Sequence, residues 1–348
     1  MLKLKDLIYV FAPLRLCVEF LSLLLLYLFL VSATSLNAES WLGFESDEIC
    51  GDPEKCCWGR NLQVTLPNGS KVSCAIGNFD AEDQKITLYA SQGGVATFEG
   101  NLSTGEPYKI EAVRYTLTRQ EGEIVVVADA PIFLDGGSWG QIRCDGKMEA
   151  YLSSEGKLRK ILLEGTTTLT SNCEGKKFCR IPGELSLNLD EGMIVGFAVK
   201  EQIYFEGEVG GLFSNSFKIY YDKESKQPLK YILDGEVRVK NIFALQESLA
   251  GKLDQHALAD RMEYDVVEGK AILNAVGGHR VLFLDQAHKM QLSAGELHIF
   301  YDKDTKIPVV KGIGDVHLSF GDKEIEKIEK VKKDFSDLRG LESLPWSL

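Results

Sequence analysis

Apolar and polar positions alternate in short runs between about residues 60 and 320. For example, Leu62-Gln-Val-Thr-Leu66 alternates and stops at Pro67-Asn68-Gly69, and the run from Ile203 to Val209 ends at Gly210-Gly211. A period of two places successive side chains on opposite faces of a strand, and clusters of Gly, Asn and Pro mark turns. No stretch of useful length before residue 320 has helical periodicity. The pattern therefore predicts an all-β fold of the sandwich, roll or barrel type.

A longer unit recurs within this alternating region. The stretch from Phe217 to Pro228 (FKIYYDKESKQP) returns as Leu297 to Pro308 (LHIFYDKDTKIP), and each copy runs on into a Gly-acid-Val turn. Shorter relatives of the unit begin at Met148 and at Met262. Repeated units of strand, polar turn and strand are typical of stacked supersecondary structure that shares one core.

The spacing inside the unit identifies candidate lining residues. Apolar side chains two positions apart share one face of a strand, so each unit presents an apolar face. A filled core is the simpler interpretation for any single residue, and an open apolar channel is the alternative. The candidate lining residues are Phe217, Ile219, Tyr221, Leu258, Met262, Tyr264, Leu297, Ile299 and Tyr301.

The N-terminal region predicts export. Basic residues precede an apolar run from Phe20 to Val31, and small residues follow it up to Ala38. This order is typical of a secretory signal peptide. The alternative is an uncleaved membrane anchor starting nearer Leu7. That anchor would place Arg15 and Glu19 inside the span, at about 2.5–3.5 kcal/mol or more each.

Changes in pattern divide the chain into five parts. The last part begins after Gly321, where apolar residues are spaced by three or four among Lys and Glu, as in an amphipathic helix. We expect this helix either to cap an end of the β structure or to dock on a partner. The parts are a signal peptide (1–38), an irregular Cys-rich lead-in (39–58), two β-roll halves (59–185 and 186–321), and a C-terminal amphipathic helix with its tail (322–348).

The cysteines fit an oxidising compartment. Of the eight cysteines, Cys17 lies in the predicted signal, and export makes disulfides the default expectation for the other seven. Cys173 and Cys179 flank a short turn and are the best candidate pair, while the odd total leaves one thiol over. A zinc site in the group from Cys50 to Cys74 is disfavoured, because that group lacks a C-x-x-C unit and a nearby His.

Charge and motif content exclude several classes of function. The net charge of -12 argues against a nucleic-acid partner, because phosphate binding needs a basic surface. All five histidines lie between His256 and His317 without an H-x-x-x-H pair, and no G-x-S-x-G motif or phosphate-binding glycine loop occurs. We therefore expect no enzyme, no cofactor and no metal.

Three stretches of the chain resemble a known family. They are Ala259-Asp-Arg-Met-Glu-Tyr-Asp265, Leu292-Ser-Ala-Gly-Glu-Leu-His-Ile-Phe-Tyr-Asp302 and Gly312-Ile-Gly-Asp-Val-His-Leu318. This order of Ala-Asp-x-apolar-x-Tyr-Asp, polar turn and Gly-x-Val resembles the LptA/OstA family of lipopolysaccharide-transport proteins. The match is closest over about residues 216–320 and is eroded over about 109–170. The many cysteines and the chain length depart from the family pattern.

The resemblance implies a twisted, slit β-jelly roll in the periplasm that holds acyl chains inside and joins other β-roll proteins through edge strands. We therefore expect non-enzymatic binding and transfer of lipopolysaccharide, or a similar acylated glycolipid, toward the outer membrane. A membrane-anchored component of the LptC type, in the inner membrane, is one alternative. A disulfide-crosslinked β-solenoid scaffold is a second alternative, and an envelope enzyme on a β-sandwich is a third.

Overall fold

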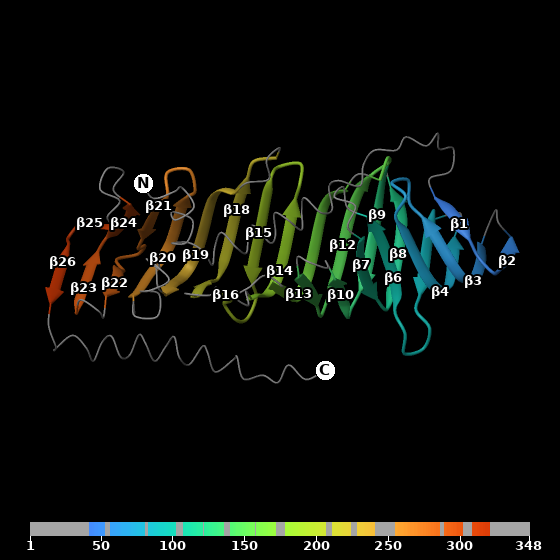
Figure 1. The fold of residues 1–348 in the computed structure, drawn as a ribbon, viewed down its shortest axis with the longest axis horizontal. Coiled ribbons are helices and arrows are strands. Elements are labelled where there is room, and N and C mark those ends of the chain that lie inside the picture. The colour runs from blue at the N-terminus through green and yellow to red at the C-terminus, as the bar shows by residue number, and fades with distance from the viewer. Residues whose placement is uncertain are drawn as a thin grey trace.

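The structure is a computed structural model that describes residues 42–52, 56–80, 83–101, 107–120, 122–135, 140–156, 158–171, 178–206, 211–223, 228–240, 255–285, 289–301 and 308–320. These residues form 26 strands in one antiparallel sheet, and none of them is helical. The all-β prediction is confirmed. The strands cross the long axis of the molecule and follow one another along it, from β1–β4 at one end to β26 at the other (Figure 1).

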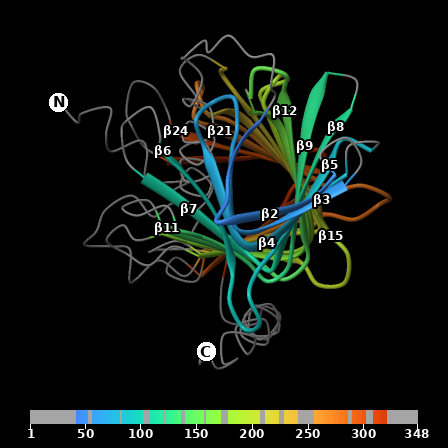
Figure 2. The same cartoon turned by 90° about the vertical axis from the view of Figure 1, so that its right-hand side faces the viewer.

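Strand pairing divides the sheet into two walls, which we call wall A and wall B. Seen from the end, the walls fan out from a shared corner (Figure 2). Wall A contains β2 (Glu48–Asp52), β5 (Lys85–Tyr89), β8 (Arg114–Gln120), β9 (Glu123–Asp129), β12 (Lys147–Ser153), β15 (Met193–Ala198), β18 (Ser216–Tyr221), β21 (Lys270–Asn274), β24 (Glu296–Tyr301) and β25 (Pro308–Ile313). Wall B contains β1 (Gly43–Glu45), β6 (Ala96–Asn101), β7 (Pro107–Ala112), β10 (Ile132–Asp135), β11 (Gly140–Cys144), β16 (Ile203–Glu206), β17 (Gly211–Ser214), β22 (Val281–Asp285), β23 (Met290–Ala294) and β26 (His317–Phe320).

Six long strands belong to both walls: β3 (Cys56–Thr65), β4 (Lys71–Asp80), β13 (Leu158–Ser171), β14 (Phe178–Asn188), β19 (Pro228–Lys240) and β20 (Gln255–Asp265). In β13, for example, residues 158–164 pair with β12 of wall A, and residues 167–171 pair with β11 of wall B. The long strands therefore bend at the corner and hold the two walls together.

Glycines allow the close backbone approach that this corner needs. Gly146 and Gly165 face each other there, and Gly165 has a φ of +99°, a conformation that other residues rarely adopt. A Cβ on Gly146 would overlap the backbone carbonyl of Glu164. In β19, the corner is a bulge between Asp234 and Val237, which lets the strand change direction without losing its partner β20.

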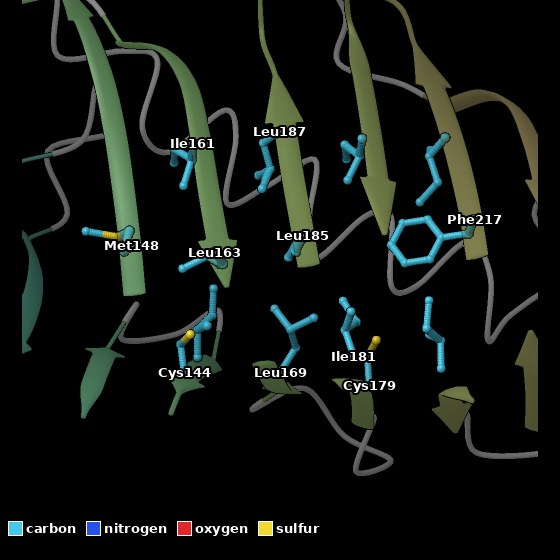
Figure 3. Close-up of a cluster of buried hydrophobic side chains, with 14 of the residues drawn as sticks. Cys144, Met148, Ile161, Leu163, Leu169, Cys179, Ile181, Leu185, Leu187 and Phe217 are labelled. Atoms are coloured by element: carbon cyan, nitrogen blue, oxygen red, sulfur yellow. The ribbon is translucent and has the colours of Figure 1, made fainter. Parts of the chain in front are cut away.

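The apolar side chains meet between the two walls. Successive residues alternate between buried and half-buried along β9 and β12, as the period of two predicts. Figure 3 shows buried side chains of the two walls directed toward one another, with Met148, Leu163 and Phe217 on one side and Cys144 and Leu169 on the other. Burying each such leucine or isoleucine contributes about 1.5–3 kcal/mol, so this interior is the main source of stability.

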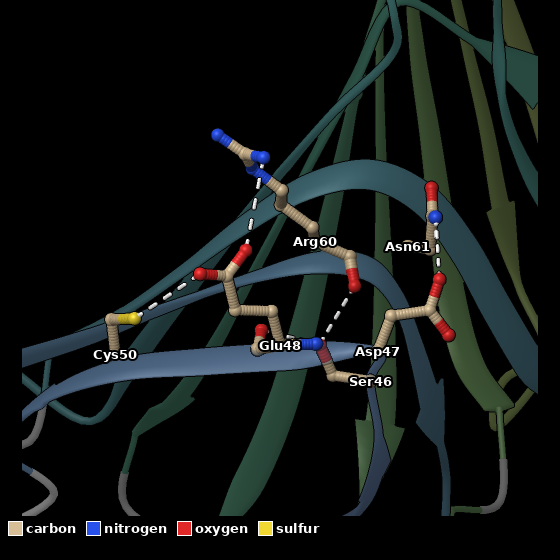
Figure 4. A network of polar contacts seen from close by, with 6 residues as sticks. All are labelled: Ser46, Asp47, Glu48, Cys50, Arg60 and Asn61. Atoms are coloured by element: carbon tan, nitrogen blue, oxygen red, sulfur yellow. Dashed lines mark hydrogen bonds and ion pairs between the residues drawn. The ribbon is translucent and has the colours of Figure 1, made fainter.

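The segment before residue 59 differs from the irregular lead-in that the sequence predicts. β1 and β2 both pair with β3, one in each wall. Between them the Ser46 hydroxyl donates a hydrogen bond of 2.7 Å to the Arg60 carbonyl, and the Asn61 amide donates one of 2.7 Å to Asp47 (Figure 4). These bonds fix the break that sends β1 and β2 into different walls. β2 pairs with the first residues of β3, which begins at Cys56 inside the Cys-rich stretch, and β1 pairs with the last residues of β3, beyond that stretch.

The predicted boundary between the two β-roll halves and the two predicted terminal segments compare with the structure as follows. The predicted boundary after residue 185 falls inside β14, which pairs with strands on both sides. The signal peptide at 1–38 and the C-terminal helix at 322–348 lie outside the described residues. Among the described residues, no helix has the length and hydropathy needed to cross a membrane.

Candidate functional site

An apolar cavity lies between the two walls in the N-terminal half of the roll. Its free volume, counted where the centre of a water molecule can lie, is about 60 Å³. Its lining comes from both walls: Asn68, Phe98, Ile110, Ile132, Leu134, Ile142, Cys144, Met148, Ala150, Leu152, Gly156, Leu158, Ile161, Leu163 and Leu187. A cavity with this lining favours hydrocarbon over polar ligands.

Strand β12 shows how the local sequence builds the cavity. Met148, Ala150 and Leu152 point inward, whereas the alternate residues Glu149 and Tyr151 are half-buried on the outer side. On that outer side the Tyr151 hydroxyl donates a hydrogen bond of 2.6 Å to Glu149, and this bond raises the pKa of Tyr151 to about 12. The inner face of β12 therefore forms an apolar part of the cavity lining. Its outer face carries the neutral, hydrogen-bonded phenol of Tyr151.

Two hairpins meet at the free edges of the walls beside this cavity. The turn between β3 and β4 carries Asn68, and the turn between β12 and β13 carries Gly156. The Asn68 amide nitrogen is 3.4 Å from the Gly156 carbonyl, to which it donates. The amide is held in place because its oxygen accepts a hydrogen bond of 3.0 Å from the backbone N–H of Ser70. One hydrogen bond thus joins the walls at the mouth of the cavity.

The cavity contains one thiol, which is chemically inert. Burial raises the pKa of Cys144, and its thiol donates a hydrogen bond of 3.3 Å to the Glu164 carbonyl. Because nucleophiles and metal ligands need the thiolate, Cys144 acts here as a small apolar residue. Within the described ranges, no group of three or more His, Cys, Asp or Glu residues is placed to hold a metal.

Most of the candidate lining residues lie in the other half of the roll. Seven of them are buried there: Phe217, Ile219, Tyr221, Met262, Tyr264, Leu297 and Ile299. The space beside Phe217 and Ile219 has no room for a water molecule. Phe205 meets Phe217 edge to face at 5.4 Å, and Tyr231 stacks on Tyr264 at 5.8 Å. These aromatic rings fill the interior that the N-terminal half leaves open.

Two candidate lining residues stand apart from the others. Leu258 is half-buried between the buried Ala257 and Ala259, so it points away from the interior face on which we expected it. The alternation in β20 shifts by one residue between Ala259 and Met262, beside the bulge in β19, which the spacing in the sequence did not reveal. The backbone of Tyr301 ends β24, and its side chain lies outside what the structure describes.

The proposed disulfide partners are not both described. Cys179 is buried and points into the interior opposite Leu169 (Figure 3). Cys173 lies outside the described residues, so this pairing stays a prediction.

The residues that line the cavity are not among the candidates that the sequence pattern predicted. Their strands show the same alternation as the chosen ones, for example in β10 and β12. What distinguishes them is the size of the side chains that meet across the interior. Ala150 lines the open half, whereas Phe217 and Tyr231 occupy the filled half.

This chain shows a partial structural similarity to a known protein. No family model matches the sequence, and no curated protein matches it. Part of the chain is similar to the crystal structure of LptH, the LptA-homologous periplasmic component of the lipopolysaccharide transport device from Pseudomonas aeruginosa. The TM-score is 0.30 at 12% identity, and the alignment covers 39% of this chain and 89% of that chain.

Proposed function

We propose that this chain is a non-enzymatic periplasmic carrier of lipopolysaccharide or a similar acylated glycolipid. The observation that carries the proposal is the apolar cavity between the walls, with its mouth at Asn68 and Gly156. Each methylene group transferred from water into such a lining is stabilised by about 0.8 kcal/mol. An acyl chain therefore gains shelter inside, while a sugar head group stays in water at the free edges of the walls.

The choice of lipid class rests on the sequence. The repeat at Ala259–Asp265, with its continuations near Tyr301 and Gly312, resembles the lipopolysaccharide-transport family. The predicted signal peptide would deliver the mature chain to the periplasm, where such lipids cross between membranes. Movement of the lipid would draw its energy from another protein, because nothing in a hydrophobic shelter needs a nucleophile or a metal.

The filled half of the roll limits where the lipid binds. Acyl chains would lie beside β12 and β13 and end before Phe217, where aromatic rings leave no free space. The chain would therefore hold its ligand in one half of the molecule, with the other half as a rigid support.

Both ends of the roll offer strands for partner proteins. Within the described chain, β1 and β2 each pair with one strand at one end, and so do β25 and β26 at the other. Free edges of this kind add strands from another protein through main-chain hydrogen bonds. We propose that other β-roll proteins of a transport bridge bind at these edges.

A photocrosslinking experiment tests the lipid site. A photoreactive amino acid is placed at Met148 inside the cavity, at Glu149 on the outside of the same strand, or at Ile219 in the filled half. With purified lipopolysaccharide, we expect capture at position 148 at least tenfold above that at positions 149 and 219. Equal capture at positions 148 and 149 would contradict the proposal, and so would no capture anywhere.

A structural scaffold is the second candidate function. The aromatic packing around Phe217 and Tyr231 favours it, because a load-bearing roll needs a filled interior. Covalent oligomers on non-reducing electrophoresis, together with no lipid capture at position 148, would support the scaffold.

A further inference from the structure

A row of mostly apolar residues runs along the outer face of wall B in the C-terminal half of the roll. Cross-strand pairing places Tyr204 beside Phe213, Phe213 beside Arg238, Arg238 beside Leu258, and Leu258 beside Leu282. These residues alternate with interior residues of the same strands, so they form one row on the outside. We call this row, together with Leu284 two residues farther along β22, the outer apolar strip.

Two residues of the strip are buried although they face outward. Phe213 is 5% exposed and Leu284 is 2% exposed, yet neither belongs to the interior cluster that contains their neighbours Leu212 and Phe283. Phe213 stacks on Tyr204 at 4.5 Å, which covers part of its ring. All 26 described strands belong to the two walls, so none of them lies over the strip.

At the same level, the outer face of wall A carries several ion pairs around Ile232, whereas the strip on wall B contains one charged residue, Arg238, which pairs with Glu236 at 3.6 Å. On wall A, Arg261 pairs with Asp234 at 3.1 Å, and Lys230 pairs with Glu263 at 2.6 Å. A sheet face in contact with water is expected to be polar in this way. The outer apolar strip is therefore a face that another segment covers.

The C-terminal segment begins at the right place to cover it. β26 is the last strand of wall B, and it ends at Phe320 with 28 residues of the chain still to come (348 minus 320). Five strand spacings, at about 4.8 Å each, separate β26 from β17, which is about 24 Å. A helix from Ile325 to Leu338 would extend about 20 Å at about 1.5 Å per residue. The strip itself spans four strand spacings from β16 to β22, about 19 Å. The apolar stripe of the helix would thus match the length of the strip.

We propose that residues 322–338 dock as an amphipathic helix on the outer apolar strip of the same molecule. Val331 and Phe335 would lie near Leu258 and Leu282, while the Lys and Glu side chains of the helix would face water. This docking is independent of the proposed lipid site, which lies on the inner side of the walls and in the other half.

Photocrosslinking of the full chain tests this docking. A photoreactive residue at Leu282 should crosslink to peptides from residues 323–338, as read by mass spectrometry. The matched control is Ile272 in β21, which is half-buried on the outer face of wall A and should give no such crosslink. A mixture of isotopically labelled and unlabelled chains should show that the crosslinks lie within one molecule. Crosslinks from Leu282 into residues 241–254 alone, or between two molecules, would overturn the proposal.

Variants of the helix give a second readout. Val331→Glu with Phe335→Glu should speed amide hydrogen exchange in β17, β20 and β22 at least tenfold. Exchange in β8 and β9 should stay unchanged, and Lys330→Glu on the polar face of the predicted helix should change none of these rates. Unchanged exchange in β17, β20 and β22 in the double variant would overturn the docking, whatever the outcome of the lipid experiment.

Discussion

Individual glycines decide whether this sheet can bend. Gly146 has the backbone of Glu164 against it, and Gly165 adopts a positive φ beside it. No larger residue fits at Gly146 without moving the neighbouring strand. The close approach of the two strands at the corner therefore depends on a glycine at position 146.

Gly146→Ala should lower the free energy of unfolding by about 1–3 kcal/mol, the range for forcing an extra methyl group into a packed site. The cause is the overlap between the new Cβ and the Glu164 carbonyl. Chemical denaturation followed by circular dichroism measures the change. Gly295→Ala is the matched control, because its Cβ would meet its nearest atom at an ordinary 3.5 Å. Equal losses in the two variants would show that the corner tolerates a side chain.

The spacing of apolar residues in the sequence predicts the inward or outward direction of some side chains correctly and of others wrongly. His298 lies between the fully buried Leu297 and Ile299 and is itself only partly buried, as alternation predicts. Leu258 breaks the rule because the alternation in β20 shifts before Met262. A one-residue shift moves a side chain to the opposite face, and local spacing carries no sign of it.

At the scale of elements, the strands are predictable from the sequence, but the position of the open site is not. Alternation marks β10, β12 and β24 equally well, although the first two lie beside the cavity and the last lies in the filled half. Free space depends on which side chains meet across the interior, and those partners are far apart in the sequence. The pairing of β1 with β3 joins residues about 20 positions apart, whereas β2 and β3 form a local hairpin whose alternation the Cys-rich sequence did not reveal.

The ion pairs on the outer face of wall A should make stability depend on pH. Hydrogen bonds from Lys230 and then Arg261 lower the pKa of Glu263 from its usual 4.5. A lowered carboxyl pKa stabilises the fold above the unfolded-state value, and this contribution is lost as the pH falls through the folded-state value. We expect a coupling energy of about 0.2–1 kcal/mol between Glu263 and Lys230 at pH 7, which fades toward pH 3. A double-mutant cycle of Glu263→Gln and Lys230→Gln measures it at both pH values. A coupling that is the same at pH 3 as at pH 7 would contradict the assigned cause.

At the scale of the whole molecule, one sheet encloses two different interiors. The N-terminal half has an apolar cavity, and the C-terminal half is closed by the rings of Phe205, Phe217, Tyr231 and Tyr264. The division falls close to the boundary between the two predicted β-roll halves, because every residue of the cavity lining except Leu187 precedes residue 186. It follows the volumes of a few interior side chains.

Removing one of these rings should lower the stability of the fold and open free space in the C-terminal half of the interior. Phe217→Ala should lower the free energy of unfolding by about 3–5 kcal/mol, as for other buried phenylalanines. If the ring is what stops the ligand, a photoreactive residue at Ile219 should then capture lipopolysaccharide, whereas we expect no capture there while Phe217 is present. Phe217→Leu is the control, with a smaller loss of stability and little capture. Absence of capture at Ile219 in a folded Phe217→Ala protein would show that other side chains close the interior.

The six strands shared by both walls have a mechanical consequence. Their hydrogen bonds run from neighbour to neighbour, so a swing of the walls about the corner would leave the ladders within each wall intact. Near the cavity, the bond from Asn68 to Gly156 is a contact that such a swing breaks. We expect the angle between the walls to act as an adjustable aperture, so that thick or branched cargo of the proposed kind would widen it without unfolding any strand.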